Sequence, residues 1–156
     1  MKYLKFIIYI CICLFLTGCS YKYVSLDITK DNSIIIEKIN INEKYTIDSI
    51  DNFVNGIVMF NENGRPDKEN SNTVIGAHSG YGKNAYFNDL NKLEKDDIIK
   101  IIYNNAEYKY IVIDKKIVDE TDLSVLEDSN DNILTLLTCK IGNNTKRIIV
   151  ISKLIH

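Results

Sequence analysis

Apolar and β-branched residues recur in short runs along the 156-residue chain, with polar loops between them, a pattern typical of β-strands. An Asn104-Asn105 pair between two of the runs predicts a hairpin. Many short strands with few helical segments predict a small barrel or sandwich without internal repeats. The predicted strands are 33–41, 56–60, 73–77, 98–103, 108–113, 132–139 and 147–154.

Two short segments between these runs predict helical turns. Phe87, Leu90 and Leu93 recur at three-residue spacing, so a turn over 88–93 is expected to pack against the core. Thr121 is suited to cap a second turn over 121–127, because its hydroxyl can accept a backbone N–H bond. Polar residues predict loops at 61–72 and 140–146.

The first twenty residues have the composition of an export signal. Lys2 and Lys5 precede the apolar stretch 6–15, which Leu-Thr-Gly-Cys follows at 16–19. This tetrapeptide resembles the lipobox of bacterial lipoproteins, which implies lipidation of Cys19. The alternative is an uncleaved anchor over 6–21, although these 16 uncharged residues are short for a hydrocarbon core of about 30 Å. Either form tethers the protein on the outer face of a membrane.

The remaining length fits one folded domain. We expect a leader or anchor at 1–19, a tether at 20–32 and a single domain at 33–156. The formal charge is −2, and removal of Lys2 and Lys5 with the leader makes it more negative. The chain has no basic footprint for nucleic acid, so we expect no nucleic-acid partner.

Cysteine usage singles out Cys139. The other three cysteines lie within the first twenty residues, so the predicted domain has no internal disulfide. An exported protein with one unpaired thiol is a candidate for cysteine chemistry. Taken alone, a cysteine at such a position is more often a small buried apolar residue than a nucleophile.

Two further residues are candidate partners of this thiol. His78 follows a predicted strand and precedes a flexible Ser-Gly-Tyr-Gly stretch, whereas the only other histidine, His156, is terminal and mobile. Arg147 is one of only two arginines and lies eight residues after Cys139, close enough for a hairpin to place them side by side. Its guanidinium is a planar fork of donors suited to an oxyanion. Individually, each is also compatible with a residue that has no catalytic role.

Taken together, these segments resemble the sortases. SIIIEKINI resembles their first strand, TVIGAHS the strand before the catalytic histidine, LTLLTC the segment with the nucleophile, and KRIIV the last strand with its arginine. The 87–93 spacing followed by Asp97-Ile98 is also similar. The resemblance implies a mostly β fold, an eight-stranded barrel with short helical turns. It also implies Cys139, His78 and Arg147 as catalytic residues, with Thr138 supporting the shape of the site.

The resemblance further implies a cysteine transpeptidase. Its substrates would be secreted proteins with a C-terminal sorting signal of the Leu-Pro-x-Thr-Gly kind, cleaved through a cysteine thioester. The acyl group would pass to an amine of a peptidoglycan precursor or a pilin, on the surface of a Gram-positive-type bacterium. No cofactor is expected, and we identify no counterpart of the acidic calcium site that some members carry.

The chain departs from the family pattern at several positions. Ala77 replaces a common glycine before the histidine, and Asp96 replaces a common turn glycine, a change that Asp tolerates. No proline follows Cys139, so the sortase class stays open. Two alternatives compete: a non-catalytic surface lipoprotein that binds peptide or wall fragments, and an L,D-transpeptidase, whose His-Gly and Ser-His-Gly-Cys motifs are absent.

Overall fold

The computed structural model describes residues 31–50 and 56–156. The predicted leader at 1–19 and the tether up to residue 30 lie outside the described residues. Within these described residues, three short 3₁₀ helices occur among the strands: η1 (Glu37–Ile39), η3 (Leu90–Lys92) and η4 (Leu123–Leu126). The strands are β1 (Ser33–Ile36), β2 (Ile41–Asp48), β3 (Ile57–Phe60), β4 (Asn72–Ala77), β5 (Ile98–Tyr103), β6 (Ala106–Asp119), β7 (Ile133–Lys140) and β8 (Asn143–Leu154).

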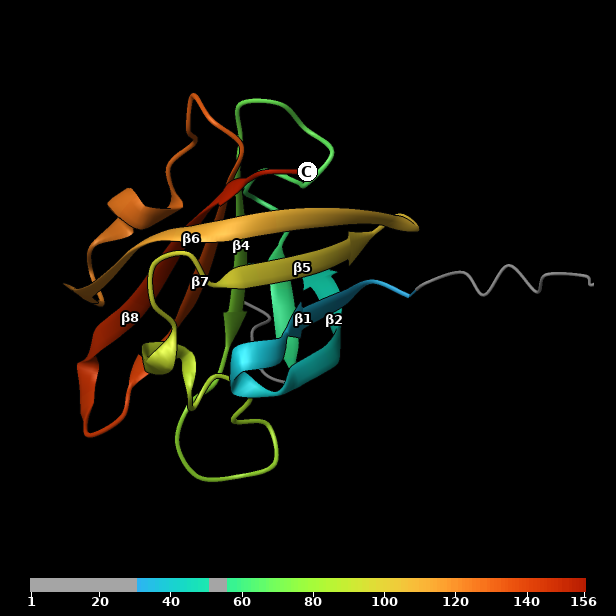
Figure 1. The fold of residues 1–156 in the computed structure, drawn as a ribbon. Coiled ribbons are helices and arrows are strands. Elements are labelled where there is room, and N and C mark those ends of the chain that lie inside the picture. Colours follow the sequence, from blue (N-terminus) through green and yellow to red (C-terminus); the bar gives the residue numbers. More distant parts are fainter. Residues whose placement is uncertain (1–30, 51–55) are drawn as a thin grey trace, which may run out of the picture.

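The strands form a closed barrel in the order β1-β2-β3-β4-β7-β8-β6-β5 (Figure 1). Most neighbours are antiparallel, but β2 pairs with β3 and β4 pairs with β7 in parallel. This result confirms the predicted mostly β fold and its eight-stranded barrel. The parallel β4–β7 pair matters most for the site, because it brings two carboxyl ends to the same edge.

The barrel interior is filled by aliphatic and aromatic side chains. Phe87, Leu90 and Leu93 are completely buried and belong to this core, so the segment around η3 packs as the spacing predicted. Burial of each such side chain contributes about 1.5–3 kcal/mol. Other fully enclosed residues come from the strands, including Ile34, Met59, Ile75, Ile99, Ile101 and Leu136.

The prediction of one strand over 33–41 is wrong. The strand β1 ends at Ile36, and the chain turns through η1 before β2 begins at Ile41. Asn40 has φ 55°, a left-handed conformation that Asn adopts more readily than β-branched residues do. The run of isoleucines therefore spans two antiparallel strands, in which Ile36 pairs with Ile41.

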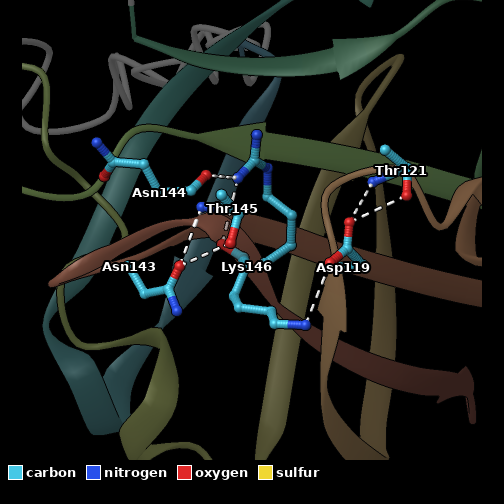
Figure 2. A network of polar contacts seen from close by, with 7 residues as sticks. Asp119, Thr121, Asn143, Asn144, Thr145 and Lys146 are labelled. Atoms are coloured by element: carbon cyan, nitrogen blue, oxygen red, sulfur yellow. Dashed lines mark hydrogen bonds and ion pairs between the residues drawn. The ribbon is translucent and has the colours of Figure 1, made fainter.

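The predicted cap of the second helical turn is also wrong. The helix η4 begins at Leu123, and Asp122 is its N-cap, accepting a bond from the Ser124 N–H at 3.1 Å. Thr121 instead donates its hydroxyl to Asp119 at 3.0 Å (Figure 2). A carboxylate at the position before the helix is as effective a cap as a hydroxyl.

Two hairpins differ in how closely they match expectation. The turn at Asn104 and Asn105 is confirmed, with φ of 49° and 66°, the positive values that a tight hairpin requires. The loop predicted over 140–146 is shorter, because β7 extends to Lys140 and β8 begins at Asn143. Gly142, with φ 80°, completes this turn. The strand β6 runs to Asp119, well beyond its predicted end.

Candidate active site

Strand register brings His78, Cys139 and Arg147 together. In the parallel β4–β7 pair Gly76 lies opposite Leu137, so His78, two residues further on, reaches the level of Cys139. The strand β8 returns antiparallel to β7 and places Arg147 directly opposite Cys139. The three residues therefore lie on three neighbouring segments at one edge of the barrel.

Three hydrogen bonds hold the end of β4 beside this edge. Thr138, which is buried, donates its hydroxyl to the Ala77 carbonyl at 2.7 Å. Ser79 donates its hydroxyl to the Cys139 carbonyl at 2.5 Å. The backbone N–H of Phe87 donates to the His78 carbonyl at 3.1 Å. Because residues on both sides of His78 are bonded to β7, its backbone has a fixed position relative to Cys139.

All three candidate residues, together with Thr138, line one cleft of about 360 Å³. This volume lies in the range of small-molecule and peptide-side-chain sites. Much of the wall is apolar, and the acidic residues Glu120 and Asp122 also contribute to it. The other lining residues are Ile50, Phe60, Val118, Leu123, Val125, Leu126, Leu137 and Ile149.

The Arg147 guanidinium is held by three polar contacts and keeps further donors. Its Nη1 donates to the carbonyls of Asn144 at 2.7 Å and Lys146 at 3.2 Å, and its Nη2 forms an ion pair with Glu120 at 2.9 Å. A guanidinium has five N–H donors, so two have no acceptor within the part of the chain that the structure describes. These two donors are available to a carbonyl or oxyanion in the cleft.

A second ion pair links β6 and β8 beside the Arg147–Glu120 pair. The Lys146 ammonium contacts Asp119 at 3.1 Å (Figure 2). In the chain, each of these two residues directly precedes a member of the Arg147–Glu120 pair. A hydrogen bond from the backbone N–H of Thr121, with a further bond from Lys146, lowers the pKa of Asp119. Figure 2 also shows the Asn143 side chain accepting bonds from Thr145 in the β7–β8 hairpin. The segment that carries Arg147 is therefore well ordered by local polar contacts.

Three residues that shape this site are absent from the predicted site residues. Ser79 donates its hydroxyl to the Cys139 carbonyl, and Glu120 forms an ion pair with Arg147. Both contacts lie at the barrel edge. Asn88 clasps Gly80, accepting its N–H at 2.7 Å and donating to its carbonyl at 3.2 Å. Only Ser79, adjacent to the histidine, had a local signal.

His156 lies away from the cleft. Its backbone pairs with Lys109, near the start of β6, whereas Glu120 follows the end of that strand. The expectation that His78, and not the terminal histidine, accompanies the thiol agrees with this placement.

A second cleft, of about 470 Å³, adjoins the first. The two clefts have Cys139 in common and no other lining residue. Ser79, Lys116 and Lys140 are among the residues around the second cleft. Cys139 is thus the residue at which the two cavities adjoin.

Residues 31–50 and 56–156 contain neither a metal-binding cluster nor a membrane-spanning helix. In these ranges no group of three His, Cys, Asp or Glu side chains is placed to hold a metal ion. The helices of the same ranges are all too short to cross a bilayer.

A thiol, an imidazole and a guanidinium around one cleft are groups that acyl transfer by a cysteine nucleophile can use. Residues 26–155 match the model of the sortase domain. The chain therefore belongs to the sortase family, as the sequence motifs predicted.

Relatives in this family show the same fold. Sortase A of Listeria monocytogenes is 31% identical over 84 residues, which cover 53% of this chain and 38% of that protein. The structure of sortase C1 from Streptococcus agalactiae superposes with a TM-score of 0.73 at 26% identity, covering 80% of this chain and 67% of that one. A sortase C from Clostridium perfringens, solved with the C-terminal cell wall sorting motif, gives 0.71 at 27% identity, covering 80% and 69%. The curated relatives are matched over 38–52% of their own length.

Proposed function

We propose that this protein is a cysteine transpeptidase that cleaves a sorting motif of the Leu-Pro-x-Thr-Gly kind in secreted proteins. It holds the acyl fragment as a thioester on Cys139 and passes it to an amine of a peptidoglycan precursor or a pilin. The observation that carries this proposal is the register that aligns His78, Cys139 and Arg147 on adjoining segments. The similarity to a sortase solved with a cell wall sorting motif supports the choice of substrate.

In the first step the Cys139 thiolate attacks the carbonyl carbon of the scissile amide. A C–S bond forms, and the carbonyl oxygen becomes an oxyanion that the two available Arg147 donors stabilise. Collapse of this intermediate breaks the C–N bond. The His78 imidazolium gives its proton to the departing amine, so the leaving group departs neutral.

In the second step a neutral amine of the acceptor attacks the thioester carbonyl. A new C–N bond forms, the C–S bond breaks, and the sulfur leaves as a thiolate. The neutral His78 imidazole takes the proton that the amine loses. The enzyme returns to its starting protonation state, with one amide exchanged for another and no net redox change.

The cleft suits an extended peptide with apolar side chains. The side chains of Leu126 and Leu137 line it and pack against the buried Phe60 cluster. An apolar residue of the motif placed there loses water-exposed surface, at about 25 cal/mol per Å² buried. The scissile carbonyl then lies toward Cys139 and Arg147.

The proposal is tested with a fluorogenic sorting-motif peptide and the full chain in detergent solution. We expect cleavage by the natural sequence and by Cys19→Ser, but none above background by Cys139→Ala. Retention of cleavage in Cys139→Ala would refute the assignment of the nucleophile. Loss in Cys19→Ser would indicate that the cleavage depends on another thiol.

We also propose that the N-terminal segment tethers the enzyme to the outer face of the membrane, with Cys19 as the lipidated residue. The motif at 16–19 supports this proposal. Substitution of Cys19 by Ser is expected to remove the lipid mass and to weaken membrane retention in cells. Unchanged mass and retention would favour the uncleaved anchor.

A further inference from the structure

One wall of the first cleft is built by a segment that is not part of the barrel sheet. Other lining residues, such as Leu137 and Ile149, lie on strands and are held by the β7–β8 ladder. The helix η4 has only four residues and lies outside this ladder, so its position depends on how it is attached to the barrel. We refer to its lining residues, with the N-cap, as the η4 wall: Asp122, Leu123, Val125 and Leu126.

Two asparagines attach the end of η4 to the barrel. The Asn72 Nδ2 donates to the carbonyls of Val125 and Glu127, both at 3.0 Å. The Asn63 Nδ2 donates to the carbonyl between them, that of Leu126, at 2.7 Å. The last carbonyls of a helix have no intrahelical donor, and here three in succession receive one from an asparagine amide. We refer to Asn63 and Asn72 as the asparagine clamp.

Asn72 is itself fixed within the barrel. It begins β4 and is only 4% exposed. Its Oδ1 accepts the hydroxyl of Thr135, in β7, at 2.8 Å, and its backbone carbonyl accepts the Gly64 N–H at 2.9 Å. The Asn72 amide therefore joins β4, β7 and the η4 segment in one buried unit, in which removal of a partner leaves a polar group unsatisfied.

Apolar packing alone does not determine how η4 is oriented over the cleft. Leu126 packs against the buried cluster around Phe60, and Val125 is also buried. Leu123, however, is 65% exposed although it lines the cleft. Apolar contacts are non-directional, whereas hydrogen bonds require a particular distance and angle. The orientation of the η4 wall therefore depends on the asparagine clamp.

We propose that Asn63 and Asn72 are positioning residues that set the affinity of the first cleft for the sorting-motif peptide by fixing the η4 wall. This inference rests on the proposed transpeptidase function. Neither asparagine is among the residues that line the cleft, so both act through η4. A wall that already has its binding position adds little ordering cost when the peptide binds. Without the clamp this position is only partly populated, and the apparent affinity falls by that fraction.

The clamp acts on binding and not on bond making. Strand pairing places His78, Cys139 and Arg147 without any contribution from η4. Glu120, the ion-pair partner of Arg147, is held separately, because its backbone N–H donates to the Thr145 carbonyl at 2.9 Å. Loss of the clamp should therefore raise the peptide concentration needed for half-saturation and leave the limiting rate of thioester formation nearly unchanged.

The test measures single-turnover thioester formation in the full chain over a series of sorting-motif peptide concentrations. Asn72→Asp keeps the shape of the side chain and an acceptor for Thr135, but a carboxylate has no N–H to donate to η4. We expect its half-saturating concentration to rise about tenfold and its limiting rate to stay within about threefold of the natural value. An unchanged half-saturating concentration, or a loss confined to the limiting rate, would overturn the inference.

A second variant tests the clamp from its less buried side. Asn63→Ala removes one of the three bonds and leaves the Asn72 amide in place, so it is informative even where Asn72→Asp does not fold. Asn63 is only partly buried, and water can replace its amide. The half-saturating concentration should rise about threefold, and no rise in a folded Asn63→Ala protein would count against the clamp.

Thr135→Val is the matched control. It removes a hydrogen bond from the same buried asparagine but no contact with η4. Its melting temperature should fall, whereas its half-saturating concentration should stay within about twofold of the natural value. An equal rise in Thr135→Val and Asn72→Asp would show that affinity follows general destabilisation, and the inference would fail.

Two measurements without the peptide separate the wall from the thiol. Hydrogen exchange of the backbone amides at 123–127 should be faster in both clamp variants and unchanged in Thr135→Val, because the clamp opposes local opening of this segment. Alkylation of Cys139 by iodoacetamide, located by peptide mapping, should proceed within about twofold of the natural rate, since the thiol lies on β7. Unchanged exchange at 123–127 in Asn72→Asp would contradict the clamp.

The outcomes separate the inference from the function on which it rests. If the natural sequence forms the thioester and the clamp variants reach half-saturation at the same peptide concentration, only the inference fails. If the natural sequence forms no thioester at any peptide concentration, the transpeptidase proposal fails and the inference falls with it.

Discussion

Replacement of Arg147 by Lys separates the charge of this side chain from its geometry. The guanidinium makes three anchoring contacts, to the carbonyls of Asn144 and Lys146 and to the Glu120 carboxylate, and has two further donors available to the cleft. A lysine ammonium keeps the charge and can satisfy the anchoring acceptors. Its three donors do not extend as a planar fork, so the donors for the oxyanion are lost.

The structure sets the size of the expected effect. Loss of an oxyanion donor typically lowers the rate by about 10²- to 10³-fold, or about 2.7–4 kcal/mol of transition-state stabilisation. The effect on stability is much smaller, below about 1 kcal/mol, because Arg147 and Glu120 are partly exposed, with side-chain exposures of 26% and 43%. Arg147→Lys should therefore fold normally and react slowly.

The assay is single-turnover formation of the thioester, quenched in acid and followed by intact mass. Lys146→Gln is the matched control, because Lys146 forms the same kind of ion pair one residue away, with Asp119 at 3.1 Å. We expect this control to change the acylation rate by no more than about twofold. An Arg147→Lys rate within about threefold of the natural sequence, in a protein of unchanged melting temperature, would refute an oxyanion role.

The remaining predictions concern stability. Thr138→Val should lower the free energy of unfolding by about 1–3 kcal/mol, because it leaves the Ala77 carbonyl without its 2.7 Å donor. Ser152→Ala, which removes a buried hydroxyl with no partner among the described residues, should be neutral or stabilising, and urea denaturation compares the two. For Asp97, burial raises the pKa, but hydrogen bonds from Lys38 and from the Glu94 backbone N–H outweigh it, so the net pKa is lowered. Its contribution to stability is therefore present above the unfolded-state pKa and is lost as pH falls through the lower folded-state value. The destabilisation caused by Asp97→Asn should be measurable at pH 7 and disappear under strongly acidic conditions, and an equal effect at both pH values would contradict this.

Much of the barrel follows from local sequence, because β-branched runs and turn residues act over a few positions. The hairpin at Asn104 and Asn105 is an example, since two consecutive positive φ values suit Asn. The wrong prediction of a single strand over 33–41 also comes from reading a local apolar run. Ile39 and Ile41 continue an apolar run, and Asn40 alone signals that the chain turns there.

The site depends on contacts that are distant in sequence. His78 and Cys139 are brought together by parallel pairing of β4 with β7, and no local pattern specifies that register. The motif resemblance identified these residues without requiring the register. Glu120 had no comparable signal, because its contact with Arg147 depends on the full length of β6 and on the shortened β7–β8 turn.

The most direct test of the central claim is to trap and locate the acyl-enzyme. The full chain is mixed with a sorting-motif peptide, quenched in acid within the first turnover and analysed by intact mass and peptide mapping. We predict a mass increase equal to the acyl fragment, located on Cys139 and released by hydroxylamine, as expected for a thioester. Cleavage of the peptide without any adduct on Cys139, or an adduct on a different residue, would contradict the account.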